Sequence, residues 1–138
     1  MVRFLAGLKG EGKTRIIVDK ANENAKATDG SLVFIDDDSR RMHEIHRDIR
    51  LVEAGKGRLS SCRGLTYFIW GMLTQNADIK HVYVDGLNTI VRDEATNDDL
   101  IKFKKALDKL NNEFGAGFTV AMHCDRDSLP AEIKEILL

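Results

Sequence analysis

Runs of apolar residues separated by helical patterns divide this 138-residue chain into alternating strands and helices. Continuous apolar runs at 31–35, 81–84 and 118–122 predict strands that are buried on both faces of a parallel sheet. Shorter runs predict a first strand at 2–6 and an edge strand at 49–53. This alternation favours an α/β fold, a three-layer sandwich around a mostly parallel sheet.

Apolar residues at helical spacing predict the helices that connect these strands. The strongest patterns predict helices at 13–27, from the Ser60-Ser61 cap to about 75, and from 98 or 99 to 113. The weaker patterns predict a short charged helix at 40–48, a polar loop at 88–97 and a closing helix at 130–138.

The loop after the first strand carries the most specific chemistry, Gly7-Leu8-Lys9-Gly10-Glu11-Gly12-Lys13-Thr14. This is the pattern G-x-x-x-x-G-K-T of a phosphate-binding loop, in which glycines let backbone N–H groups wrap around an anion. Lys13 can reach the terminal phosphates, Thr14 can ligate Mg²⁺, and a helix that begins here directs its positive end at the phosphates. We therefore predict that this loop and the adjoining Arg15 bind a nucleotide.

Polar residues follow three of the predicted strands. Asp85 follows the strand at 81–84, the position of the Walker B carboxylate that ligates Mg²⁺, although a turn residue is the alternative. One of Asp36, Asp37 and Asp38 can hold a metal-bound water or act as a base, and the alternative is an acidic turn or helix cap. His123 either senses the γ-phosphate or merely ends the last strand.

Composition and charge limit the expected partners. A net charge of −1 and a pI near 6.4 give no global indication of nucleic-acid or membrane-surface binding. No apolar run approaches the ~18–20 residues of a membrane span, and residues 1–7 are too short for a signal peptide. Two cysteines do not make a disulfide framework. We therefore expect one cytoplasmic domain that covers residues 1–138.

With both nucleotide motifs identified, the chain resembles a minimal P-loop NTPase of the RecA-like kind over nearly its whole length. The resemblance rests on the phosphate-binding loop, on Asp85 and on the stretch LVFIDDD from Leu32 to Asp38. The chain is also similar to small bacterial ATP-binding proteins labelled as relatives of the twitching-motility (pilus-retraction) ATPases. The resemblance implies ATP and Mg²⁺ as ligands, Asp38 or Asp37 as the water-activating carboxylate, and His123 as the phosphate sensor.

The resemblance implies a slow Mg-dependent ATPase in which Lys13 and the metal stabilise the phosphoryl charge and an Asp orients water. RecA-like sites are often completed by a neighbouring subunit, which implies a homo-oligomer; an unidentified protein partner is the other expectation. Gly86 stands after Asp85 where many AAA-type ATPases have a catalytic Glu, which favours a non-hydrolysing switch or adaptor. A small-molecule or nucleotide kinase, with Lys56-Gly57-Arg58 as its lid, is the third hypothesis.

Overall fold

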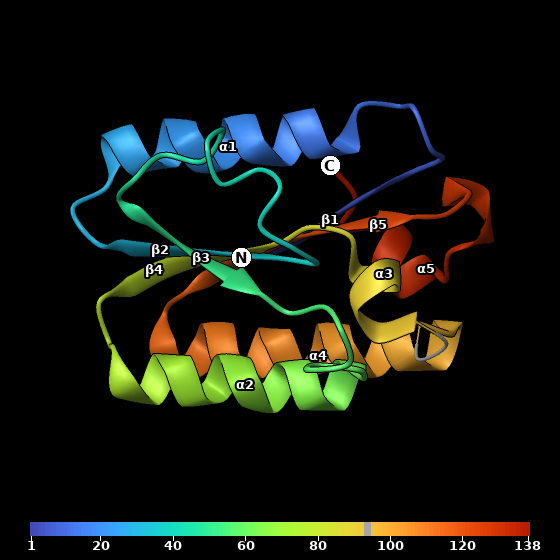
Figure 1. Cartoon of the computed structure of the whole chain (residues 1–138). Coiled ribbons are helices and arrows are strands. Elements are labelled where there is room, and N and C mark those ends of the chain that lie inside the picture. Colours follow the sequence, from blue (N-terminus) through green and yellow to red (C-terminus); the bar gives the residue numbers. More distant parts are fainter. Residues whose placement is uncertain (93–94) are drawn as a thin grey trace.

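The chain folds around a five-stranded sheet, seen in a computed structural model that describes residues 1–92 and 95–138 (Figure 1). Its strands are β1 (Val2–Gly7), β2 (Ser31–Asp36), β3 (Ile49–Glu53), β4 (Ile79–Val84) and β5 (Gly117–His123). They are ordered β1-β5-β4-β2-β3, and every neighbouring pair is parallel. All five strands were predicted, and the sheet is parallel throughout.

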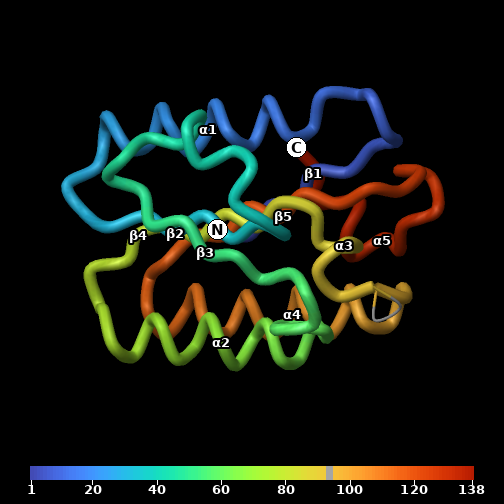
Figure 2. The backbone as a smooth tube through the Cα atoms, viewed as in Figure 1, coloured from blue at the N-terminus to red at the C-terminus, as the bar shows by residue number. Residues whose placement is uncertain are grey.

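Helices cover both faces of the sheet and make three layers. The helix α1 (Lys13–Ala27) lies on one face, and α2 (Cys62–Gln75) and α4 (Asn97–Phe114) lie on the other (Figures 1 and 2). Each face has its own apolar cluster: Ile17 and Phe34 belong to the α1 side, and Leu65 and Phe103 to the α2–α4 side. The predicted three-layer α/β sandwich is therefore confirmed.

The predicted helix at 40–48 is wrong, because this segment forms a series of turns. Bonds such as the one from Met42 N–H to Ser39 O, at 3.1 Å, span three residues. The side chain of Asn22, on α1, also donates to Glu44 O and accepts from His46 N–H, each at 2.8 Å. A side chain distant in sequence thus bonds to backbone groups of this segment.

The predicted loop at 88–97 is partly wrong, because α3 (Leu87–Val91) begins it. Leu87, Ile90 and Val91 are buried, so three apolar side chains hold this short helix against the sheet. Asn97 already belongs to α4. Asp93 and Glu94, which the loop was expected to contain, lie outside the described residues.

The predicted closing helix at 130–138 is too long. After the short turn η2 (Arg126–Ser128), the helix α5 covers only Ala131–Lys134. The chain end then runs beside β1, where Phe4 N–H donates to Ile136 O at 3.0 Å and Leu138 N–H donates to Phe4 O at 2.8 Å. Pairing with the outer edge of β1 therefore replaces the last helical turn.

Across residues 1–92 and 95–138, no helix has both the length and the apolar character that crossing a bilayer requires.

Candidate functional site

The residues predicted to bind phosphate and metal lie at the carboxyl edge of the sheet, where ligands of parallel α/β folds are usually bound. A pocket of about 440 Å³ opens there between the loop after β1 and the ends of β4 and β5. It is lined by Lys9, Gly10, Gly12, Lys13, Thr14, Arg15, Asp85, Gly86, Asn88, Thr89, Ala121, Met122 and His123.

The loop after β1 is held in shape by bonds to Leu8. Lys13 Nζ donates to Leu8 O at 2.8 Å, and Glu11 Oε1 accepts from Leu8 N–H at 3.0 Å. Gly7 admits this arrangement, because a Cβ there would lie 2.9 Å from Glu11 Oε2. Of the predicted nucleotide-binding residues, Gly7, Leu8 and Glu11 therefore shape the loop, and the other six line the pocket.

Glycine is required at two points of this loop. Gly10 and Gly12 have φ values of 87° and 79°, a left-handed conformation that L side chains rarely adopt. Around both positions, no described atom lies within 4 Å of where a Cβ would be. The loop thus exposes its backbone to the pocket, which is what close approach of an anion needs.

The beginning of α1 is electropositive. Gly12 stands at the N-cap, where the described residues supply no side-chain hydrogen bond, and the first turn contains no acidic residue. Lys13 and Arg15 lie in that turn and line the pocket. The first N–H groups of a helix lack acceptors within the helix, so this end can bind an anion.

The two predicted Mg²⁺ ligands lie together. Thr14 hydrogen-bonds the Asp85 carboxylate, which is 6% exposed. Burial raises the pKa of Asp85 above its ordinary value, and the bond from Thr14 opposes that rise. A hydroxyl and a carboxylate are oxygen ligands of the kind that Mg²⁺ prefers.

Asp36 is a second buried carboxylate at this edge of the sheet. It ends β2, beside β4, and is 6% exposed. Burial raises its pKa from 3.8 to about 6, the N–H of Asp37 lowers it through a 2.7 Å bond, and the charge of Asp85 raises it. A buried carboxylate whose pKa is raised by a second carboxylate marks a place where a divalent cation would be stabilised.

None of Asp36, Asp37 and Asp38 lines the pocket, and Asp37 and Asp38, the predicted catalytic carboxylates, have other contacts. Asp38 is paired with Arg40 at 2.7 Å, and bonds from the backbone and side chain of Arg40 lower the pKa of Asp38. Asp37 packs against Gly55 in the turn after β3, and its backbone carbonyl accepts a bond from Gly55 N–H at 2.9 Å. A catalytic role for either stays a prediction.

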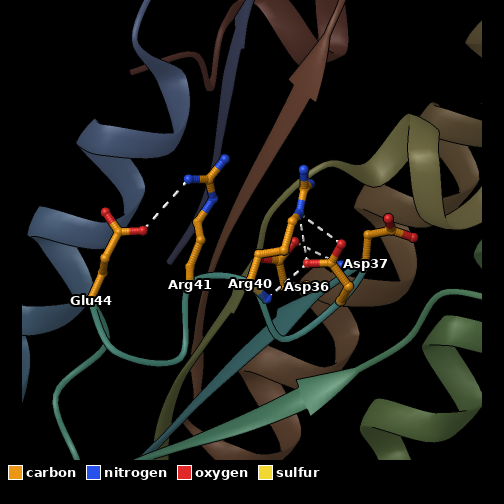
Figure 3. A network of polar contacts seen from close by, with 6 residues as sticks. Asp36, Asp37, Arg40, Arg41 and Glu44 are labelled. Carbon is orange, nitrogen blue, oxygen red and sulfur yellow. Dashed lines mark hydrogen bonds and ion pairs between the residues drawn. The ribbon is translucent and has the colours of Figure 1, made fainter.

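Two arginines follow these aspartates and have different acidic partners (Figure 3). Arg40 turns back toward Asp38, whereas Arg41 rises beside α1 and lies 3.6 Å from Glu44. The charge of Arg41 lowers the pKa of both Asp36 and Asp85. Arg41 is thus the cation of this loop that acts on the acidic pair.

His123 lines the pocket from the end of β5, beside Gly7 of β1. Its backbone N–H donates to Asn88 Oδ1 at 2.7 Å, which joins β5 to α3, and its exposed side chain lines the pocket. The sequence analysis missed Asn88 and Thr89, because it treated this segment as a loop. The sequence feature that could have indicated this helix is Gly86 shortly after the strand at 81–84, followed by the apolar Leu87.

The proposed kinase lid does not reach this pocket. Arg58 lies 3.8 Å from Glu53 of β3, and none of Lys56, Gly57 and Arg58 lines the pocket. Within the described part of the chain, no group of three or more His, Cys, Asp or Glu residues is arranged to hold a metal. Thr14 and Asp85 would therefore supply only part of the coordination of a Mg²⁺ ion. Mg²⁺ usually completes its coordination with water molecules and substrate phosphates.

Comparison with known proteins gives no relative from which to transfer a function. No family model matches the chain, and no curated protein matches it.

Proposed function

We propose that this protein binds a magnesium nucleoside triphosphate, with ATP as the expected nucleotide, and hydrolyses it slowly as a RecA-like P-loop NTPase. The observation that carries the proposal is the start of α1, which has basic residues but no side-chain cap and opens onto a pocket. The same pocket contains the Thr14–Asp85 pair. An anion site next to an oxygen site suits a phosphate tail with its Mg²⁺.

Lys13 is the residue proposed to change partners when the nucleotide binds. Its ammonium group bonds to Leu8 O at 2.8 Å, at the edge of the loop, so it is already held near the backbone amides. Rotation toward the pocket would exchange a neutral carbonyl for a phosphate oxygen. Bonds between two charged groups are stronger than bonds to neutral ones, which favours this exchange.

Thr14 and Asp85 would hold the Mg²⁺, which would neutralise charge on the phosphates when bound. Lys13 and the loop amides would stabilise the charge that develops on the transferred phosphoryl group. His123, at the end of β5, would donate a hydrogen bond to the terminal phosphate.

Asp36 replaces Asp37 and Asp38 as our candidate for the carboxylate that orients water. It is buried beside Asp85, whereas Asp38 is paired with Arg40 and Asp37 packs against Gly55. With a pKa of about 6, Asp36 is mostly ionised at neutral pH and can accept a proton. Its short side chain would act on water that is also positioned by the phosphates.

Release of phosphate from ATP tests this assignment. A general base typically raises the rate of the chemical step about 10²–10⁴-fold. Asp36→Asn should therefore lower kcat by at least about a hundredfold and leave the Kd for ATP within about threefold. The matched variant Asp38→Asn changes the same chemical group in an aspartate that is paired with Arg40, and it should keep its kcat. Loss of turnover in Asp38→Asn alone would return the role to Asp38.

A nucleotide-dependent switch is the second candidate, because Gly86 adopts φ 71° directly after Asp85. This position therefore supplies no carboxylate, and Asp36 would be the remaining acid beside Asp85. Binding of ATP without phosphate release in the wild type would support the switch. Release that requires an added acceptor would instead support a kinase.

A further inference from the structure

The two outer edges of the sheet differ. The edge at β1 is paired with the chain end, through the bonds of Phe4 with Ile136 and Leu138. The opposite edge is β3, which pairs only with β2. Figure 1 shows β3 facing outward, with α2 on the neighbouring layer. An edge strand with free backbone groups is a template on which another strand can pair.

The backbone groups that β3 directs outward can be assigned from its pairing. Ala54 N–H donates to Asp36 O, so Ala54 faces β2, and every second residue before it does the same. Leu51 and Glu53 therefore direct their N–H and C=O groups away from the sheet. Within residues 1–92 and 95–138, none of these four groups takes part in a hydrogen bond.

A groove of about 660 Å³ runs beside this strand, between the beginnings of β2 and β3 and the second half of α2. Its apolar lining comes mainly from α2 and β2, and Arg50 lines it from β3 itself. Gly71 opens the groove, because no described atom lies within 4 Å of where its Cβ would be. The lining includes Arg50, Tyr67, Phe68, Gly71, Met72 and Ile79.

Charge selects the type of strand that fits. Exposed basic residues follow the edge from the segment before β3 to the turn after it: Arg47, Arg50, Lys56 and Arg58. Only Asp48 and Glu53 oppose them within this segment, and Glu53 lies 3.8 Å from Arg58. A strand laid along this edge would therefore be favoured by acidic side chains.

We propose that β3 and the groove beside it bind an extended, acidic peptide segment of a partner protein. The segment adds a sixth strand through the backbone groups of Leu51 and Glu53, and one large apolar side chain enters the groove beside Gly71. Backbone pairing then supplies affinity, and the groove supplies specificity. This site is separate from the phosphate pocket and does not depend on nucleotide binding.

The probe is a fluorescein-labelled nine-residue peptide that alternates glutamate with valine and has phenylalanine at its centre. Fluorescence anisotropy should show saturable binding to the wild-type protein, and replacement of glutamate by lysine should weaken it at least about tenfold. Two further peptides carry N-methyl groups on alternate residues, in the two opposite registers. Only one of them should lose binding, because a strand pairs through every second residue.

A pair of variants tests the groove. Gly71→Leu fills the groove and should lower the affinity for the peptide at least about tenfold. This is the loss expected when one large apolar side chain of the peptide stays exposed. Thr74→Leu adds the same side chain to an exposed position of α2 outside the groove and should leave the affinity unchanged. Leucine is a better helix former than glycine or threonine, so both variants should keep α2 folded.

Three results would overturn the proposal: no saturable binding of the acidic peptide, equal effects of the two N-methylated registers, or unchanged affinity in Gly71→Leu. Light scattering after size exclusion identifies the other occupant. A wild-type dimer that Gly71→Leu abolishes would assign the edge to a second copy of this chain instead.

Discussion

Two helices of similar length begin in opposite ways. At α4, Thr96 and Asp99 cap each other: the Thr96 hydroxyl accepts from Asp99 N–H at 3.2 Å, and the Asp99 carboxylate accepts from Thr96 N–H at 3.1 Å. Asp98 and Asp99 also place negative charge at the positive end of α4. At α1, glycine stands at the cap, and Lys13 and Arg15 follow it.

The difference separates a helix that satisfies its own beginning from one that leaves it for a ligand. A side-chain cap is worth about 1 kcal/mol, and acids in the first turn add to it. The first turn of α1 lacks both contributions and adds positive charge, and it lines a pocket whose one acidic lining residue is the buried Asp85. Both halves of the contrast can be tested by substitution.

The largest effect is expected from a carboxylate placed at the start of α1. Gly12→Asp should lower the affinity for ATP more than about a hundredfold, because like charges a few ångströms apart repel by several kcal/mol at a protein surface. Gly115→Asp is the matched control: its φ is 77° against 79° for Gly12, and neither site has a described atom within 4 Å of the added Cβ. Calorimetric titration should find unchanged affinity in this control, and equal losses would remove the contrast.

The buried Asp36, at the end of β2, should give the next largest effect. The pKa of Asp36 is raised in the folded protein, so its contribution to stability is present below pH 3.8 and is lost as the pH rises through about 6. In metal-free protein, Asp36→Asn should therefore gain about 2–3 kcal/mol in free energy of unfolding between pH 4 and pH 7, relative to wild type.

Urea unfolding at the two pH values measures this gain. Asp38→Asn is the control, because the pKa of Asp38 is lowered and the sign of its pH dependence is opposite. A pH-independent difference between Asp36→Asn and wild type would show that burial does not raise the pKa of Asp36.

Removing the cap of α4 should have a smaller effect, and on stability alone. Thr96→Ala should lower the free energy of unfolding by about 1 kcal/mol and leave the Kd for ATP within about twofold. Thr74→Ala, at an exposed position of α2, serves as the reference for losing a threonine outside a cap. A change in ATP affinity in Thr96→Ala would mean that the two helix beginnings are not independent.

The smallest effect is expected from charge reversal in the first turn of α1. Arg15→Glu should stabilise the nucleotide-free protein by about 0.3–1 kcal/mol, because a negative charge suits a helix N-terminus. The same substitution should lower the affinity for ATP, so the stability of the protein and its affinity for ATP change in opposite directions. Asp98→Lys at α4 should lower stability by a similar amount without affecting ATP, and thermal unfolding with and without ATP measures both.

The sheet could be predicted from the sequence because its inner strands are buried on both faces. Runs such as the one that ends at Asp36 are nearly continuous in apolar residues and contrast with the helices around them. The errors fell where a distant group decides the local structure. Asn22 bonds to the turns near Glu44, and β1 pairs with the chain end after Lys134.

The phosphate loop and Asp85 could be proposed from sequence because each has a fixed place relative to a strand. The choice among Asp36, Asp37 and Asp38 could not, because it depends on the residue at which β2 ends. β2 includes Asp36, which packs beside β4, and the two aspartates after it turn toward Arg40 and Gly55. Asn88 was missed because α3 depends on burial against the sheet.

Calorimetric titration of Mg-ATP into the wild type and Lys13→Ala tests the central claim most directly. Loss of a charge-assisted bond to phosphate should raise the Kd about 10–150-fold, and the control Lys26→Ala, at the far end of α1, should bind as the wild type does. Equal affinity of Lys13→Ala and wild type, or no binding by the wild type, would contradict the assignment of this pocket to a nucleotide.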